Sequence, residues 1–147
     1  MNIRKATIED IEQLSVLFDA YRVFYEKTSD IEQAIAFLSE RINNHESEIY
    51  VAENEEKKLV GFVQLYPIFS STRMKRLWLL NDLFVDGHQR SKGVGIALID
   101  KAKVLCKESD SCGMILETAK TNIIGNQLYP KTGFELDEEH NYYSWSV

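Results

Sequence analysis

Two glycines and two basic residues lie where an apolar, strand-like run gives way to a helical pattern. They follow the run at residues 76–85 and belong to the segment Arg90, Ser91, Lys92, Gly93, Val94 and Gly95. Backbone N–H groups at the start of a helix lack partners within it, and with the helix dipole they attract an anion. Glycine lets that anion approach the main chain closely. The segment therefore predicts a binding site for a phosphate or pyrophosphate.

The spacing of this segment narrows the choice of ligand. It is not the G-x-G-x-x-G pattern of dinucleotide-binding folds, because Leu98 stands in place of the third glycine, and it is not a P-loop, because no G-K-[ST] follows. The pattern R-x-x-G-x-G after a central strand resembles the acetyl-CoA pyrophosphate loop of the GNAT superfamily of N-acetyltransferases. An ordinary strand-to-helix turn with solvated basic side chains would give the same residues, so a second segment has to decide.

Residues 122–134 provide that second segment. They resemble the family signature N-x-x-A-x-x-L-Y-x-K-x-G-F, and the matching residues are Asn122, Leu128, Tyr129, Lys131, Gly133 and Phe134. Gly125 replaces the alanine of the signature, and Pro130 lies inside the expected helix, where it removes a backbone N–H. Alone, the segment would also fit a helix with a buried tyrosine and a glycine stop. Both segments occur in the family's order and separation, and the resemblance covers nearly the whole chain.

The resemblance implies direct transfer of an acetyl group from acetyl-CoA to an amine. In the family, two neighbouring parallel strands splay apart, and the pantetheine arm pairs with the open backbone of the first. Here that implies the main chain of Leu83, Phe84 and Val85, with an N–H near Leu83 that stabilises the oxyanion. The cofactor-binding set implied by the resemblance then also includes residues 90–95, Asn122, Gly125 and Tyr129.

Two proton transfers define the candidate catalytic residues. An alkyl amine has a pKa of about 10 and must lose a proton before attack, whereas the departing thiolate gains one. Tyr129 matches the family's tyrosine general acid; the alternative is a packing residue bonded to cofactor sulfur or backbone.

The general base is less clearly marked. Many family members carry a glutamate on the central strand, where this sequence has Leu79 and Asn81. Asp82 resembles the aspartate that follows this glutamate in diamine acetyltransferases, and a carboxylate in so apolar a strand needs a partner. Asp82 is therefore the candidate base or amine anchor, or else a structural aspartate bound by backbone donors or a basic residue. Asn81 could instead hold a water that relays the proton.

The acceptor is expected between the first two helices and the central strands. Arg22, Tyr25 and Trp78 are the candidate acceptor-binding residues, because an arginine and aromatic rings suit an amino acid or a related amine. The interpretation that we prefer for Tyr21 and Phe24 is core packing, and it leaves Arg22 solvated.

The elements that position these residues follow from hydrophobic periodicity. Helices are expected at residues 7–24, 29–42, 93–105 and 122–131, the first two opening with capping boxes at Thr7–Asp10 and Ser29–Glu32. Strands are expected at residues 2–6, 49–52, 59–66, 76–85, 114–117, 134–136 and 142–147. They predict an α/β fold of the GNAT type: a mixed, mostly antiparallel twisted sheet with a splayed parallel strand pair and helices on both faces. One domain is expected over residues 1–147.

Composition excludes several functions. The net charge is −6 and the pI about 5.1, so the chain lacks the basic surface that nucleic-acid binding needs. No stretch is apolar enough for a signal peptide or a membrane span, and the two cysteines form no CxxC pair. The histidines are not clustered, so no metal is expected. These features predict a cytoplasmic protein that binds neither nucleic acid nor membrane.

Three functions remain, and the first is preferred. It is acetylation of the primary amine of a small molecule, such as an amino acid or a polyamine. The second is acetylation of a protein lysine or N-terminus, and the third is a non-catalytic acyl-CoA-binding module. The aromatic strand at residues 142–147 is expected at a sheet edge, which favours a homodimer; the alternative is that another part of the same chain covers this edge.

Overall fold

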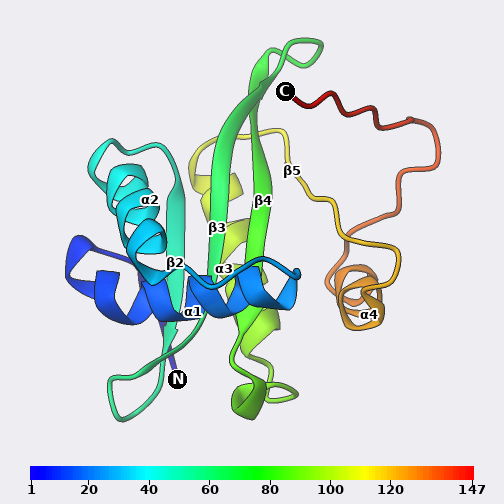
Figure 1. Ribbon diagram of the computed structural model, residues 1–147. Helices are drawn as coiled ribbons and strands as arrows, with labels where there is room; N and C mark the ends of the chain where they lie inside the picture. The colour runs from blue at the N-terminus through cyan, green and yellow to red at the C-terminus, as the bar shows by residue number, and fades with distance from the viewer. The chain divides into compact units, whose positions relative to one another are not determined.

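The computed structural model describes all 147 residues, which form two compact units at residues 1–117 and 118–147 (Figure 1). The first unit carries the sheet and three of the α-helices, and the second carries one α-helix. The single domain expected over residues 1–147 stays a prediction.

The sheet has five strands in the order β1-β2-β3-β4-β5. β1 pairs with β2, β2 with β3 and β3 with β4 in antiparallel fashion, and β4 pairs with β5 in parallel. The strands span Asn2–Lys5, Glu48–Glu53, Leu59–Ser70, Lys75–Val85 and Met114–Ile115. The mixed, mostly antiparallel sheet that the sequence predicted is confirmed, and the β3–β4 hairpin extends four residues beyond the predicted end of β3 at residue 66.

Helices cover both faces of this sheet. α1 (Ile11–Phe24) and α2 (Ile31–Asn43) lie on one face, and α3 (Val94–Glu108) lies on the other (Figure 1). The 3₁₀ turn η1 (Ile8–Asp10) precedes α1 and carries the predicted capping box of Thr7 and Asp10.

The second predicted capping box is wrong. The N-cap of α2 is Asp30, whose side chain accepts the Gln33 N–H. Ser29 instead donates its hydroxyl to Asp19 Oδ2 at 2.6 Å. The long-range bond to Asp19, which also accepts the Asp30 N–H at 2.7 Å, fixes the α1–α2 connection and moves the helix start by one residue.

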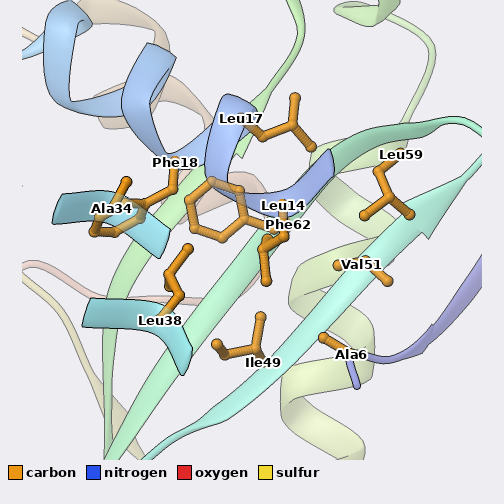
Figure 2. Close-up of a cluster of buried hydrophobic side chains, with 10 residues drawn as sticks. All are labelled: Ala6, Leu14, Leu17, Phe18, Ala34, Leu38, Ile49, Val51, Leu59 and Phe62. Carbon is orange, nitrogen blue, oxygen red and sulfur yellow. The ribbon is translucent and has the colours of Figure 1, made fainter. Parts of the chain in front are cut away.

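The main hydrophobic core lies between the sheet and the α1–α2 layer (Figure 2). From α1, Leu14, Leu17 and Phe18 follow the helical i, i+3, i+4 spacing and point to the same side. The complete cluster of buried apolar side chains is Ala6, Leu14, Leu17, Phe18, Ala34, Leu38, Ile49, Val51, Leu59 and Phe62. This packing fixes α1 over β3 and β4, where the predicted site lies.

A bulge interrupts β4 in the middle. Asp82 stands opposite Gln64 and Leu80 opposite Leu65, so Asn81 is an extra residue with no partner of its own on β3. β5 pairs only with Trp78 and Leu79, and β4 beyond Leu79 therefore has no β5 partner. The splayed parallel strand pair is confirmed, and the bulge lies where the two strands part.

The second unit consists of α4 (Ile123–Lys131) and the residues around it. Asn122 caps α4, and Pro130 falls in its last turn. The two strands expected at residues 134–136 and 142–147 are wrong: neither segment pairs with a neighbour. Asp137 does accept the N–H groups of Glu139 and His140, so the acidic turn forms without the ladder that would make it a hairpin.

The aromatic residues of this last segment are exposed. A β-branched or aromatic run becomes a strand only when its backbone finds a partner edge, because propensity alone satisfies no N–H or C=O group. The exposed apolar side chains here are Leu136, Tyr142, Tyr143, Trp145 and Val147. The homodimer that the sequence led us to expect from this segment stays a prediction.

Candidate functional site

The loop between β4 and α3 has the backbone that an anion site requires. Gly93 is the N-cap of α3 with φ of 79°, and Ser91 also has a positive φ of 63°. A left-handed conformation at the N-cap favours glycine, and the space beside its Cα is open. No side chain caps α3 and its first turn holds no acidic residue, so its first N–H groups face no competing anion.

Both basic side chains of the loop, Arg90 and Lys92, form hydrogen bonds that hold them in place. Arg90 Nε donates to the Val85 carbonyl at 3.0 Å, and its guanidinium lies 5.7 Å from the ring centres of Phe24 and Phe84. Lys92 Nζ donates to Gln89 Oε1 at 3.1 Å. These contacts hold positive charge beside the start of α3.

The open part of β4 presents backbone groups away from β3. The Asp86 N–H donates to the Val60 carbonyl of β3 at 2.9 Å, and backbone direction alternates along a strand. Phe84 therefore faces β3, whereas Leu83 and Val85 turn their backbone toward the side that β5 leaves open. The bond from Arg90 to the Val85 carbonyl agrees with this direction.

Asp82 is the centre of a buried polar network. Only 3% of its surface is exposed. Gln64 Nε2 donates to its Oδ2 at 2.7 Å, and Asn81 Nδ2 donates to its Oδ1 at 3.0 Å. The Tyr21 hydroxyl shares its one proton between the Asp82 carboxylate and the Asn81 carbonyl, which lies 3.3 Å away.

The bulge decides which way Asp82 points. With regular alternation, Trp78, Leu80 and Asp82 would share one face of the sheet. Trp78 donates its indole N–H to Ser109 at the end of α3, whereas Asp82 contacts Tyr21 of α1. The extra residue, Asn81, thus turns Asp82 from the α3 face to the α1 face.

Burial raises the pKa of the Asp82 carboxyl above its usual range, and the hydrogen bonds from Gln64, Tyr21 and Asn81 partly oppose this rise. Asp82 forms no salt bridge, and its donors are neutral. It is therefore a buried acid without a cationic partner, and not the aspartate bound by a basic residue that the sequence left open.

In the second unit, Tyr129 is half-buried, and its ring packs edge-on against Phe134 at 5.7 Å. Asn122 Oδ1 accepts the Gly125 N–H at 3.1 Å and Nδ2 donates to Thr118 at 2.9 Å. A Cβ on Gly125 would lie 2.5 Å from Asn122 Nδ2, so an alanine at this position would require the Asn122 side chain to move. The cofactor-binding role of these residues stays a prediction.

Two of the three predicted acceptor-binding side chains are engaged elsewhere. Arg22 donates to the Thr28 carbonyl at 2.9 Å and lies 3.8 Å from Asp19, so it ties down the α1–α2 connection. Trp78 is buried on the α3 face. Tyr25 is partly exposed and packs against Tyr21, with ring centres 5.0 Å apart.

The structure brings two residues to Asp82 that the sequence did not indicate as part of the site. They are Tyr21 and Gln64. The core packing that the sequence favours for Tyr21 is half correct, because its ring packs against Phe62 and Phe84 while its hydroxyl reaches β4. Gln64 is the only polar residue between Leu59 and Tyr66 of an apolar strand, and the reasoning applied to Asp82 would have flagged it.

The profile of the Acetyltransferase (GNAT) family matches residues 14–134. The chain belongs to the GNAT family. This GNAT protein is 43% identical over 147 residues to an uncharacterized N-acetyltransferase, YhfO, of Bacillus subtilis (strain 168), with 100% of this chain and 98% of the relative covered. It is 33% identical over 147 residues to a probable acetyltransferase of Haemophilus influenzae, with 100% and 99% covered. A crystal structure of a probable acetyltransferase superposes with a TM-score of 0.95 at 37% identity and covers 100% of this chain and 98% of its own.

Family membership makes the protein an acetyl-CoA-dependent N-acetyltransferase, and it confirms the resemblance and the GNAT fold that the sequence predicted. No helix is long and apolar enough to cross a membrane, and no group of His, Cys, Asp and Glu side chains gathers as metal ligands would.

Replacing Trp78 with phenylalanine tests whether this ring binds the acceptor. Because its indole N–H bonds to Ser109, we expect the free energy of unfolding to fall by about 1–3 kcal/mol. The KM for the acceptor should not change. Urea unfolding and steady-state kinetics measure both quantities. A raised KM for the acceptor with an unchanged free energy of unfolding would instead show that Trp78 binds the acceptor.

Proposed function

We propose that this GNAT enzyme acetylates the primary amine of a small molecule, such as an amino acid or a polyamine. The observation that carries this proposal is the buried Asp82 carboxylate, which has no cationic partner and lies at the open part of β4. An unpaired buried carboxylate is costly, and an ammonium group of the acceptor would offset that cost. Because Asp82 is almost fully covered and ringed by Tyr21, Gln64 and Asn81, a slender amine suits it better than a protein surface.

The residues present fit acetyl-CoA as the acetyl donor. We propose that the N–H groups at the start of α3, with Arg90 and Lys92, hold its pyrophosphate, and that the backbone of Leu83 and Val85 pairs with its pantetheine arm. Asn122, Gly125 and Tyr129 complete the proposed set. Bound acetyl-CoA supplies an activated thioester and a thiolate leaving group.

Two residues of the chain would move the protons. Asp82, directly or through a water held by Asn81, takes a proton from the acceptor ammonium, and its raised pKa brings it closer to that of the amine. Tyr129 donates a proton to the departing sulfur, and the second proton, which the nitrogen loses as the amide forms, restores the phenol. The Leu83 N–H bonds to the carbonyl oxygen on which negative charge develops.

Release of free thiol from acetyl-CoA tests the proposal across diamines, amino acids, aminoglycosides and lysine peptides. We expect turnover with one class of small amine and little with peptides. Turnover confined to peptides would replace the proposal with a protein acetyltransferase. Binding of CoA by calorimetry without any turnover would favour the acyl-CoA-binding module.

A further inference from the structure

Gln64 is a fully buried amide directly opposite Asp82 on the neighbouring strand. Its Nε2 donates to Asp82 Oδ2 at 2.7 Å, the shorter of the two amide contacts that Asp82 receives. Its Oε1 accepts the Ser47 hydroxyl at 2.8 Å. Ser47 lies between α2 and β2, so the chain Ser47–Gln64–Asp82 leads from the proposed base to a partly exposed residue.

We propose that Gln64 is a positioning residue for Asp82, and that Ser47 sets the direction of its amide. The proposal rests on the function proposed for Asp82. An ionised carboxylate only accepts hydrogen bonds, so the amide must turn its NH₂ group toward Asp82 and its oxygen away. The Ser47 hydroxyl donates to that oxygen and stabilises this orientation.

The same pair can serve the protonated acid. Once Asp82 carries a proton it can donate, and a half-turn of the Gln64 amide then presents Oε1 to Asp82 and Nε2 to Ser47. The Ser47 hydroxyl only has to rotate from donor to acceptor. Asp82 therefore keeps a buried partner before and after it takes a proton, as a base that works repeatedly requires.

The other groups around Asp82 are compatible with this role. Tyr66 of β3 has its pKa raised to about 12, first by burial and then by Asp82, so it stays protonated. Tyr21 of α1 donates to the carboxylate. Arg41 of α2 contacts Glu40 and Glu46 and forms no ion pair with Asp82. Asp82 is thus the acid in this cluster whose titration is expected to affect the rate.

The variant Gln64→Met tests the proposal, because it keeps the length of the side chain and removes the donor. The ionised carboxylate holds the Gln64 N–H more strongly than the protonated acid holds the turned amide, so losing Gln64 raises the pKa of Asp82. The acidic limb of the kcat/KM profile should therefore move up by about one pH unit. The Asp82 carboxyl carbon, followed by NMR, should titrate at the same higher pH. An unmoved limb and titration would overturn the proposal.

A matched pair at Ser47 keeps the test decisive even if Gln64→Met fails to fold. Ser47→Ala should move the acidic limb upward by less than Gln64→Met, and Ser47→Thr, which keeps the hydroxyl, should leave it at the wild-type position. Equal effects of the two would contradict the role of the hydroxyl.

Two further variants distinguish a failure of the positioning role of Gln64 from a failure of the function proposed for Asp82. Ile99→Val in α3, fully buried on the other face, controls for a general loss of packing and should not move the limb. If Asp82→Asn keeps full activity, the proposed function of Asp82 fails. If Asp82→Asn is inactive while Gln64→Met and Ser47→Ala keep the wild-type profile, only the positioning role fails.

Discussion

Replacing Tyr129 with phenylalanine is expected to lower kcat by about 10²–10⁴-fold, the usual contribution of a general acid. The thiolate of CoA would then leave without the proton that the phenol provides. The KM for acetyl-CoA should change little, because the ring and its edge-on contact with Phe134 remain. Thiol release under saturating acetyl-CoA measures the loss.

Tyr143→Phe is the matched control for this change. Tyr143 is 91% exposed in the last segment of the chain, so the same loss of a hydroxyl should leave kcat unchanged. If Tyr129→Phe retains the wild-type kcat, Tyr129 is a packing residue, as the alternative interpretation of the sequence holds. A large rise in the KM for acetyl-CoA at constant kcat would instead indicate a role in binding alone.

Replacing Asp82 with asparagine is expected to lower kcat/KM at pH 7 by about 10²–10⁴-fold. Asparagine is close in size to aspartate and can be accommodated by a half-turn of the Gln64 amide, but it cannot take a proton from an ammonium. The acidic limb of the pH profile should disappear with the activity. If activity rises again at high pH, where the amine is already neutral, the role of Asp82 as base is supported. Full activity at pH 7 would contradict it.

The same variant carries a prediction for stability. Burial raises the pKa of Asp82 in the folded protein, so its protonated form stabilises the fold. That contribution is complete below the ordinary pKa of aspartate and is lost as the pH rises through the raised value. Above that raised value the buried charge destabilises the wild type, and Asp82→Asn should be the more stable protein there. The difference in free energy of unfolding, measured in urea, should shrink as the pH falls.

The sequence by itself determined the family, most elements of the fold and the position of the loop that is predicted to bind an anion. Each of these depends on local signals. The turn at Gly93 is predictable because glycine readily adopts a positive φ, and the structure has φ of 79° there, at the N-cap of α3. The helical spacing of Leu14, Leu17 and Phe18 likewise indicated which face of α1 is buried.

The tertiary structure decided where the Asp82 carboxylate, the proposed base, points. Period-two alternation alone would place Asp82 with Trp78 on the α3 face, and one extra residue at Asn81 places it on the α1 face. A bulge is a property of two paired strands, and no single strand encodes its register. The same holds for Gln64, whose role depends on the residue opposite it.

The last segment of the chain shows what residue composition alone does not determine. Residues 142–147 have the composition of a strand, yet no strand forms, because strand propensity becomes structure only where a partner edge is available. Arg22 likewise has the charge for a substrate carboxylate but binds the Thr28 carbonyl and lies close to Asp19. The sequence determined which side chains are chemically able to act, and only long-range pairing and packing decided which of them reach Asp82.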